Sequence, residues 1–170
     1  MSPTVLDRPM TAADLPAVSR LHAEAFGPGR FARTAYRVRE GTAAISRYCR
    51  VAMLADRPIA AVRFTPITIG GQCGALLLGP LVVDREFSGQ GFGKRLIAQA
   101  MASAKADGVQ LMLLVGDEPY YGRFGFRPVP LGQISLPGPV DPRRLLAAEL
   151  APDALARFRG IVSGETSRMT

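Results

Sequence analysis

Residues 75–115 constrain the fold most, because their hydrophobic pattern changes its period twice within this short stretch. Residues 75–83 carry no charge and are almost wholly apolar, which predicts a strand buried on both faces in the middle of a sheet. The apolar positions of 92–107 instead recur at helical spacing, and Gly108 is a natural end for that helix. Residues 109–115 return to the pattern of a buried strand. A meander of strands before this strand–helix–strand unit indicates a mixed α/β fold.

Shorter predicted elements flank this unit. Thr11 and Asp14 have the spacing of a helix-capping pair, and apolar residues then recur at helical spacing. Pro66 lies inside a predicted strand and indicates an edge, a bend or a bulge, because proline cannot donate to the strand ladder. The other predictions are helices over 12–25 and 31–39, strands over 50–55 and 59–69, a short helix over 119–124, a helix over 142–150 and a strand over 156–162.

Length and composition indicate one globular domain. The chain has 170 residues, of which 48% are hydrophobic and 21% charged, a balance that disfavours disorder. We expect a single domain over 1–170, with a core at about 5–127 and a proline-rich C-terminal arm at about 128–170. One histidine and two cysteines support neither a zinc site nor a histidine-based hydrolase, so no metal is expected. No membrane span or secretory signal stands out, which favours a cytoplasmic protein without a membrane partner.

Arginine dominates the charge of the chain, whose formal net charge is +7. Between positions 30 and 63, only Glu40 and Asp56 oppose a concentration of arginines, made of Arg30, Arg33, Arg37, Arg39, Arg47, Arg50, Arg57 and Arg63. Such an excess attracts anionic partners such as nucleic acid, a phosphorylated cofactor or an acidic substrate. The alternative is a basic surface without a dedicated ligand. Basic residues do not alternate with aromatic ones as in a groove for single-stranded nucleic acid.

Gly79 and Pro80 interrupt the apolar strand predicted over 75–83. Proline removes a ladder donor and glycine weakens a strand, so the sheet is expected to be disrupted at this point. A sheet opened there can admit a ligand between two strands. A bend without function is the alternative reading.

A glycine-rich loop joins this strand to the following helix. It consists of Ser88, Gly89, Gln90, Gly91, Phe92, Gly93 and Lys94. Glycines allow a ligand to approach the backbone, and a helix start offers unpaired N–H groups with a partial positive charge, which together suit a phosphate group. A dinucleotide fingerprint would need glycine at Lys94, and a P-loop would need glycine at Ser88 and a hydroxyl residue at Arg95. Neither of these familiar loops fits.

Three ordered motifs resemble the GNAT superfamily of N-acetyltransferases. The sequence reads GPLVV at 79–83, FSGQGFGK at 87–94 and YYGRFGF at 120–126. The pattern is most similar to bacterial members that read GPLAV…GxGIG…LVGDxxYYxRFGF, and the strong resemblance covers about 76–127. The family implies a mixed, mostly antiparallel sheet that is splayed at a bulge in the central strand and flanked by helices.

The resemblance also implies acetyl-CoA as co-substrate, lying in the opening of the sheet. Backbone groups of Leu81, Val82 and Val83 would pair with the pantetheine arm, and N–H groups from about Gly89 to Lys94 would bind the diphosphate. The family usually has glutamine or arginine where this chain has Ser88, so one side-chain contribution is missing and weaker cofactor affinity is expected.

Candidate catalytic residues follow from the needs of acyl transfer and from the family pattern. A departing thiolate needs an acid that is still protonated at neutral pH, and a tyrosine phenol meets that need. Tyr121 has the position of the family's general acid, four residues before Gly125, and Tyr120 is the neighbouring alternative. A base for the amine is less defined. Asp117 is the first candidate, although it or Glu118 could instead cap a helix before Pro119; Glu24 and His22 are further candidates.

The favoured function is therefore transfer of an acetyl group from acetyl-CoA to a primary amine of a small molecule or protein, by direct attack in a ternary complex. Cys49 and Cys73 lack an activating partner, which disfavours a covalent enzyme intermediate. An acyl-CoA-binding sensor without catalysis and a basic nucleic-acid-binding module are the alternatives. The arginine-rich segment suggests an acceptor with an anionic group, and in this fold the first two helices and the segment after Phe126 build the acceptor pocket. The proline-rich arm is a candidate surface for a homodimer.

Overall fold

A computed structural model describes residues 4–26 and 34–165 of the chain. Arg30 and Arg33 of the arginine-rich segment, and the start of the helix predicted over 31–39, lie outside these residues. Within the two described ranges, no helix has the length and apolar character needed to cross a membrane.

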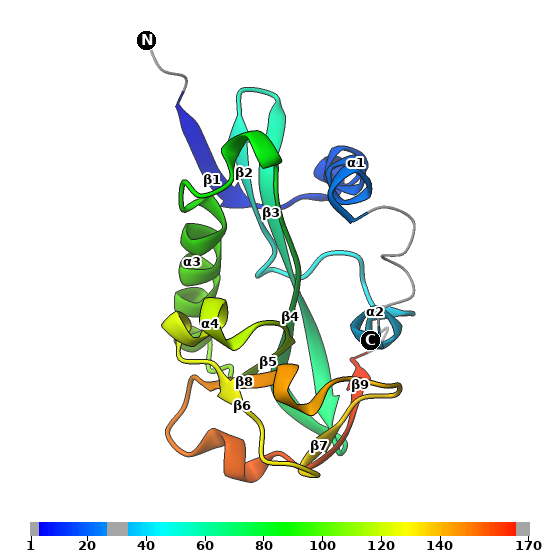
Figure 1. Ribbon diagram of the computed structural model, residues 1–170. Helices are drawn as coiled ribbons and strands as arrows, with labels where there is room; N and C mark the ends of the chain where they lie inside the picture. The colour runs from blue at the N-terminus through cyan, green and yellow to red at the C-terminus, as the bar shows by residue number, and fades with distance from the viewer. Residues whose placement is uncertain (1–3, 27–33, 166–170) are drawn as a thin grey trace.

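A mixed, mostly antiparallel sheet forms the frame of the molecule (Figure 1). Its main strands lie in the order β1-β2-β3-β4-β5-β8-β6, while β9 pairs with the C-terminal end of β3 and β7 pairs with β9. Parallel pairing joins β4 to β5 and β7 to β9. The strands are β1 (Val5–Pro9), β2 (Arg50–Leu54), β3 (Arg57–Ile69), β4 (Gln72–Val83), β5 (Leu111–Val115), β6 (Arg127–Pro128), β7 (Ile134–Ser135), β8 (Leu145–Glu149) and β9 (Gly160–Gly164). The fold class expected from the sequence is confirmed.

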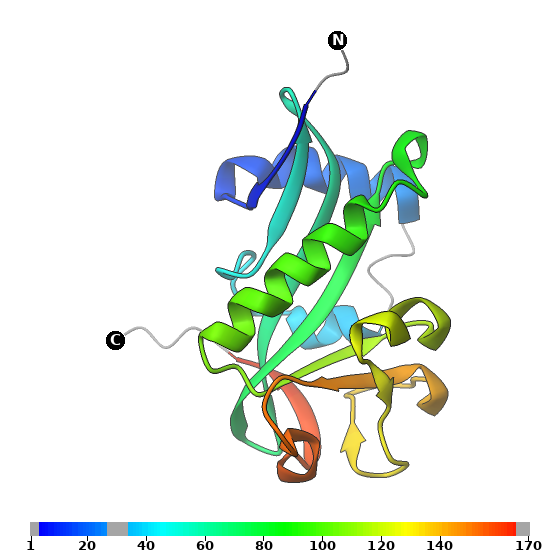
Figure 2. The same cartoon turned by 90° about the vertical axis from the view of Figure 1, so that its left-hand side faces the viewer.

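Helices cover both faces of this sheet. Figure 1 shows α3 (Phe92–Ala106) on one side of β3 and β4, and α1 (Leu15–Phe26) and α2 (Thr34–Arg39) on the other. The view in Figure 2 looks onto the face that α3 crosses. The short helix α4 (Glu118–Tyr121) follows β5 and continues into a 3-10 turn.

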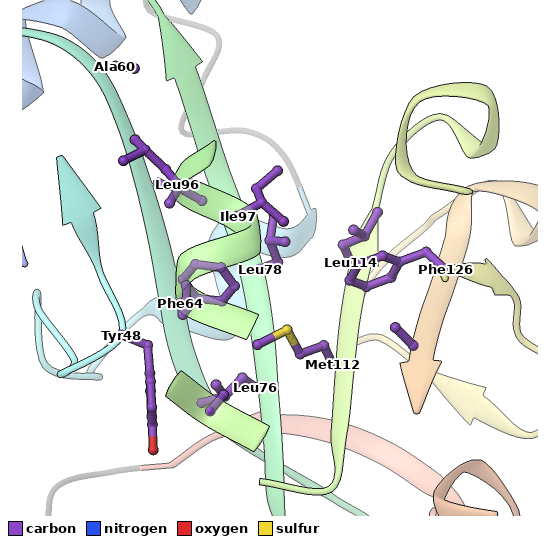
Figure 3. Packing of buried hydrophobic residues seen from close by; sticks show 14 of the residues in the cluster. Tyr48, Ala60, Phe64, Leu76, Leu78, Leu96, Ile97, Met112, Leu114 and Phe126 are labelled. Carbon is purple, nitrogen blue, oxygen red and sulfur yellow. The ribbon is translucent and has the colours of Figure 1, made fainter. Parts of the chain in front are cut away.

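The core under α3 joins this helix to the two central strands. Leu96 and Ile97 of α3 are fully buried and belong to one apolar cluster with Phe64 of β3 and Leu78 of β4, as Figure 3 shows. Met112 of β5 belongs to the same cluster. The amphipathic pattern over 92–107 therefore identified both the helix and the face that it buries.

The C-terminal arm contains one clear error of the sequence prediction. The helix predicted over 142–150 is wrong: a 3-10 turn at Pro142–Arg144 is followed by strand β8, which pairs antiparallel with all of β5. Leucine and alanine favour helix locally, but here they complete the sheet beside β5 and are buried there. Such a tertiary contact overrides intrinsic propensity.

Three smaller differences concern strand limits. The strand predicted over 156–162 begins later, as β9, after a 3-10 turn at Ala154–Arg157. The strand edge expected at Pro66 is a short stretch on one side of β3. The described pairs with β2 reach only to Val62, and those with β9 begin at Ile67. Strand β1 was not predicted, since its VLDRP sequence lacks a clear apolar alternation.

The predicted disruption of the central strand is confirmed at Gly79 and Pro80, which are joined by a cis peptide bond. Val62 of β3 pairs with Leu81 and Phe64 pairs with Leu78, so the single residue Arg63 opposes both Gly79 and Pro80. The parallel β4–β5 ladder runs from Ala75 and Leu111 to Leu77 and Leu113. The described strand pairing between β4 and β5 thus ends just before this bulge, and the second half of β4 is free on that side.

Candidate active site

A cleft of about 610 Å³ lies beside the freed half of β4. Its lining combines three segments that are distant in sequence: the end of β4, the glycine loop with the start of α3, and α4 with the turn after it. The lining residues are Leu81, Val83, Phe87, Ser88, Gly89, Gln90, Gly91, Phe92, Gly93, Lys94, Tyr120 and Arg123. The loop residues predicted from sequence are therefore brought together with two of the three predicted β4 residues.

The end of β4 forms one wall of the cleft. Leu81, Val82 and Val83 pair with Val62, Ala61 and Ala60 of β3, which leaves the opposite edge of this segment without a strand partner among the described pairs. The side chains of Leu81 and Val83 line the cleft, whereas that of Val82 is buried in the cluster under α1. A backbone edge of this kind can accept an extended ligand as an additional strand.

The glycine loop forms the end of the cleft. Gly89 and Gly91 have φ of 78° and 85°, the left-handed region that favours glycine, and a Cβ atom on either would meet no atom within 4 Å. The first backbone bond of α3 runs from the N–H of Arg95 to the carbonyl of Gly91 over 3.0 Å. The amides just before Arg95 therefore have no partner from within the helix, and they start a helix whose dipole favours a negative charge.

Gly93 has a different role, which is close packing between α3 and β4. A Cβ atom at this position would lie 3.2 Å from Val83 and 3.3 Å from Leu81. It would also lie 3.5 Å from the hydroxyl oxygen of Tyr120. A side chain at Gly93 would thus crowd both the wall of the cleft and the tyrosine opposite it.

The charged side chains in the cleft lining are both positive. They are Lys94 and Arg123, and the guanidinium of Arg123 lies 5.0 Å from the centre of the Tyr120 ring. Arg95 is directed elsewhere, since it forms an ion pair of 2.8 Å with Asp7. The cleft therefore suits an anionic ligand. Phe87 and Arg123 also line the cleft; they lie within the motifs FSGQGFGK and YYGRFGF but were not predicted as site residues.

The two candidate tyrosines occupy different places. Tyr120 lines the cleft near the start of α3, whereas the ring of Tyr121 packs against Gly116, where an added Cβ would come within 2.6 Å of it, and against Phe126. The two rings meet edge to face at 4.8 Å. Burial raises the pKa of Tyr121 to about 12, helped by the nearby Tyr120 and Asp117, so its phenol stays protonated at neutral pH. Burial also raises the pKa of Tyr120.

Tyr121 and the remaining predicted acid–base residues lie outside the lining of the cleft, which includes only Tyr120 of these candidates. Asp117 is exposed, takes the N-cap position of α4 without a side-chain cap bond, and lies 3.6 Å from Arg144. Glu118 and Glu24 are exposed, and His22 is buried. Tyr121 is thus the only one of these candidates that combines burial with closeness to the cleft tyrosine.

Cysteine and metal chemistry find no support in the described part of the chain. Cys49 is buried, and its sulfur accepts a hydrogen bond from the N–H of Phe64 over 3.4 Å. Cys73 is exposed at the start of β4, away from the cleft lining. Residues 4–26 and 34–165 contain no group of histidine, cysteine and acidic side chains that could hold a metal ion.

A sheet parted beside the start of a helix is the arrangement that the GNAT resemblance implies, and comparisons with known proteins agree. Residues 46–128 match the family model described as an acetyltransferase (GNAT) domain. This region of the chain is thus similar to GNAT acetyltransferase domains.

Two relatives illustrate the similarity. The uncharacterized N-acetyltransferase YhbS of Escherichia coli is 28% identical over 102 residues, which cover 59% of this chain and only 61% of the relative's length. The crystal structure of YhbS in complex with CoA superposes with a TM-score of 0.81 at 25% identity, over 97% of this chain and 92% of that one. A GNAT acetyltransferase from Brucella melitensis in complex with acetyl-CoA shares the fold, with a TM-score of 0.61 at 24% identity over 90% of this chain and 99% of that one.

Proposed function

We propose that the chain transfers an acetyl group from acetyl-CoA to a primary amine, carried by a small molecule or a protein, by direct attack in a ternary complex. The observation that carries this proposal is the unpaired edge of β4 leading to the open amides of the glycine loop, within one cleft. The CoA complex of the similar protein YhbS supports the same ligand here.

The glycine loop would hold the diphosphate. Residues 89–94 offer backbone N–H groups at the start of α3, and Lys94 and Arg123 add positive charge. The backbone of Leu81, Val82 and Val83 would hold the pantetheine arm along the free edge of β4. Ser88 is exposed and has a short side chain, so the backbone amides would supply most of the hydrogen bonds to the diphosphate.

The two tyrosines would then take different roles, because they lie at different points along the opening. Tyr120 is close to Gly93, at the diphosphate end. Tyr121 packs on Gly116, a few residues beyond the last β4–β5 pair at Leu113, where the two strands part. A chain that runs from the loop into the opening would bring its sulfur toward Tyr121. We therefore assign Tyr121 as the acid and Tyr120 as a binding contact.

The chemical step follows from these positions. A thioester carbonyl, supplied by acetyl-CoA, is attacked by the neutral amine; the new C–N bond forms as the C–S bond breaks. The phenol of Tyr121 donates its proton to the departing thiolate and is reprotonated from solvent. The nitrogen gives up its proton to solvent, with Asp117 as a base that can be reached through water.

An assay of free-thiol release tests this proposal. Incubation with acetyl-CoA and a panel of amines is expected to release CoA only when both substrates are present, with intersecting initial-velocity lines. Parallel lines, or an acetylated enzyme formed without amine, would contradict direct transfer. Tight CoA binding without turnover by any amine would instead support the sensor, which Ser88 favours because the usual glutamine or arginine is missing there.

A further inference from the structure

The sheet face opposite α3 carries a positive charge at the bulge of β4. Side chains alternate along β3, and both Val62 and Phe64 belong to the cluster under α3. Ala61 and Ile67 belong to the clusters on the opposite face. Arg63 therefore points away from α3, to the face that α1 and α2 cover.

Arg39 reaches the same place from α2. Its terminal Nη2 lies 2.9 Å from the position that a Cβ atom on Gly79 would occupy. Gly79 is one of the two bulge residues that Arg63 opposes across the strand pair. Two arginines from different elements thus lie at the point where β4 leaves β5, Arg39 through its guanidinium and Arg63 through its place in the strand pair.

Arg63 differs from the arginines that stabilise the described fold. Arg8, Arg57 and Arg95 each contact a carboxylate at 2.6 to 2.8 Å. Arg63 has no ion pair with any residue that the structure describes, and its Nε is buried there without a hydrogen-bond partner. A partly buried guanidinium without a counter-ion is costly, so this position suits an anion that arrives with a ligand.

The position of Arg63 also relates to the proposed chemistry. The glycine loop and α3 lie toward one face of the sheet, and the described β4–β5 pairs end at Leu77 and Leu113, just before the bulge that Arg63 opposes. A thioester that enters from the loop would meet its acceptor on the face of α1 and α2. Arg63 and Arg39 would flank that acceptor rather than the diphosphate.

We infer that Arg63, with Arg39 beside it, binds the anionic group of the acceptor, so that the enzyme acetylates small amines that carry a carboxylate or phosphate a few bonds from the amino group. The inference rests on the proposed acetyl transfer. A guanidinium binds either anion through two parallel hydrogen bonds, which orients the acceptor as well as holding it. The same positive charges disfavour an ammonium group nearby, and so favour the neutral amine that attacks.

Calorimetry on the full chain, saturated with CoA, tests this inference with matched amine pairs. One arm compares phenylalanine with phenethylamine, and the other compares O-phosphoethanolamine with ethanolamine. We expect the anionic member of at least one pair to bind about tenfold tighter or more, as for a charge-assisted hydrogen bond. Arg63→Gln should abolish that difference, whereas Arg63→Lys should keep part of it. The matched control is Arg143→Gln, because the Arg143 side chain is 91% exposed on the C-terminal arm. This control variant should keep the full difference in affinity between the anionic and the neutral amine.

The outcomes separate this inference from the proposed function. A preference for the anionic member that survives in Arg63→Gln would overturn the inference, as would equal or tighter binding of the neutral amines. Failure of all anionic probes to bind the CoA-loaded protein would overturn it too. If the unmodified chain does not bind CoA, the first titration shows this before any amine is added, and the proposed function itself is rejected. A circular dichroism spectrum of Arg63→Gln that matches the parent chain shows that the variant is folded.

Discussion

The two halves of β4, residues 75–77 and 81–83, are both apolar but differ in the strands that pair with them. Ala75, Leu76 and Leu77 pair with β3 on one side and with β5 on the other, and all three are buried. Leu81, Val82 and Val83 are as apolar, but among the strands of 4–26 and 34–165 they pair with β3 alone, and two of them line a cleft. Gly79 and Pro80 separate the halves. A break of two residues thus divides one strand into a part that stabilises the fold and a part with a free edge for a ligand.

Tyr121→Phe should have the largest effect on the proposed activity, because Tyr121 lies where β4 and β5 part. Loss of a general acid lowers kcat by about 10²–10⁴-fold. We expect kcat to fall in this range with little change in KM for acetyl-CoA, measured by thiol release. Tyr120→Phe is the matched control, since the two tyrosines are adjacent, and it should mainly raise KM. A larger loss of kcat in Tyr120→Phe would exchange the two roles.

Leu77→Ala should show what the paired half contributes. Leu77 is 0% exposed, and truncation of a buried leucine costs about 2–5 kcal/mol of unfolding free energy. We expect a loss in this range from urea unfolding, with unchanged CoA affinity in the folded protein. Leu81→Ala, in the other half, should cost less stability and weaken CoA binding. Equal effects of both variants on CoA affinity would contradict the division of β4.

Gly91→Ala tests whether the glycine loop binds CoA. An L side chain in the left-handed region costs about 1–2 kcal/mol, so the loop is expected to shift and CoA to bind about tenfold more weakly by calorimetry. Gly108→Ala is the control at the other end of α3, because its φ of 88° and its open surroundings match those of Gly91. It should lose similar stability and bind CoA normally. Equal CoA affinity in both variants would remove the loop from the site.

Asp117→Asn should have a smaller effect. Asp117 is exposed beside Arg144 and lies outside the cleft lining, so any proton must reach it through water. We expect a severalfold drop of kcat, less than a base in direct contact would give. A loss as large as that of Tyr121→Phe would place the carboxylate at the amine. A kcat equal to that of the parent chain would reject Asp117 as a base.

The pH profile should show the least change. The pKa of Tyr121 is raised to about 12 by burial, so its acid form persists well above pH 10. We expect no fall of kcat between pH 8 and 10 from loss of this acid. The folded state also binds this proton more tightly than the unfolded state, whose tyrosine pKa is about 10. The stability from Tyr121 is therefore complete below pH 10 and is lost as the pH rises toward 12. A fall of kcat near pH 9 that is absent in Tyr121→Phe would contradict this environment.

The sequence predicted most where local pattern and tertiary context agree. Residues 92–107 show their buried face in their own spacing, and Gly79 and Pro80 mark the break in β4 through their backbone limits. The strand β8 was missed because Leu145 to Ala148 favour helix alone and become a strand only beside β5. The separate places of Tyr120 and Tyr121 depend on how α4 packs against its neighbours. The position of Arg63 opposite Gly79 depends on the register of the sheet, which no local pattern reveals.

Hydrogen exchange of individual amides, with and without CoA, tests the division of β4 most directly. Addition of CoA should slow exchange at 89–94 and at those amides of 81–83 that point to the free edge of β4 rather than to β3. It should leave 75–77 unchanged, since those amides already lie in a strand that is paired on both sides. Unchanged exchange at the loop and at 81–83 under saturating CoA, or protection confined to other segments, would contradict the account.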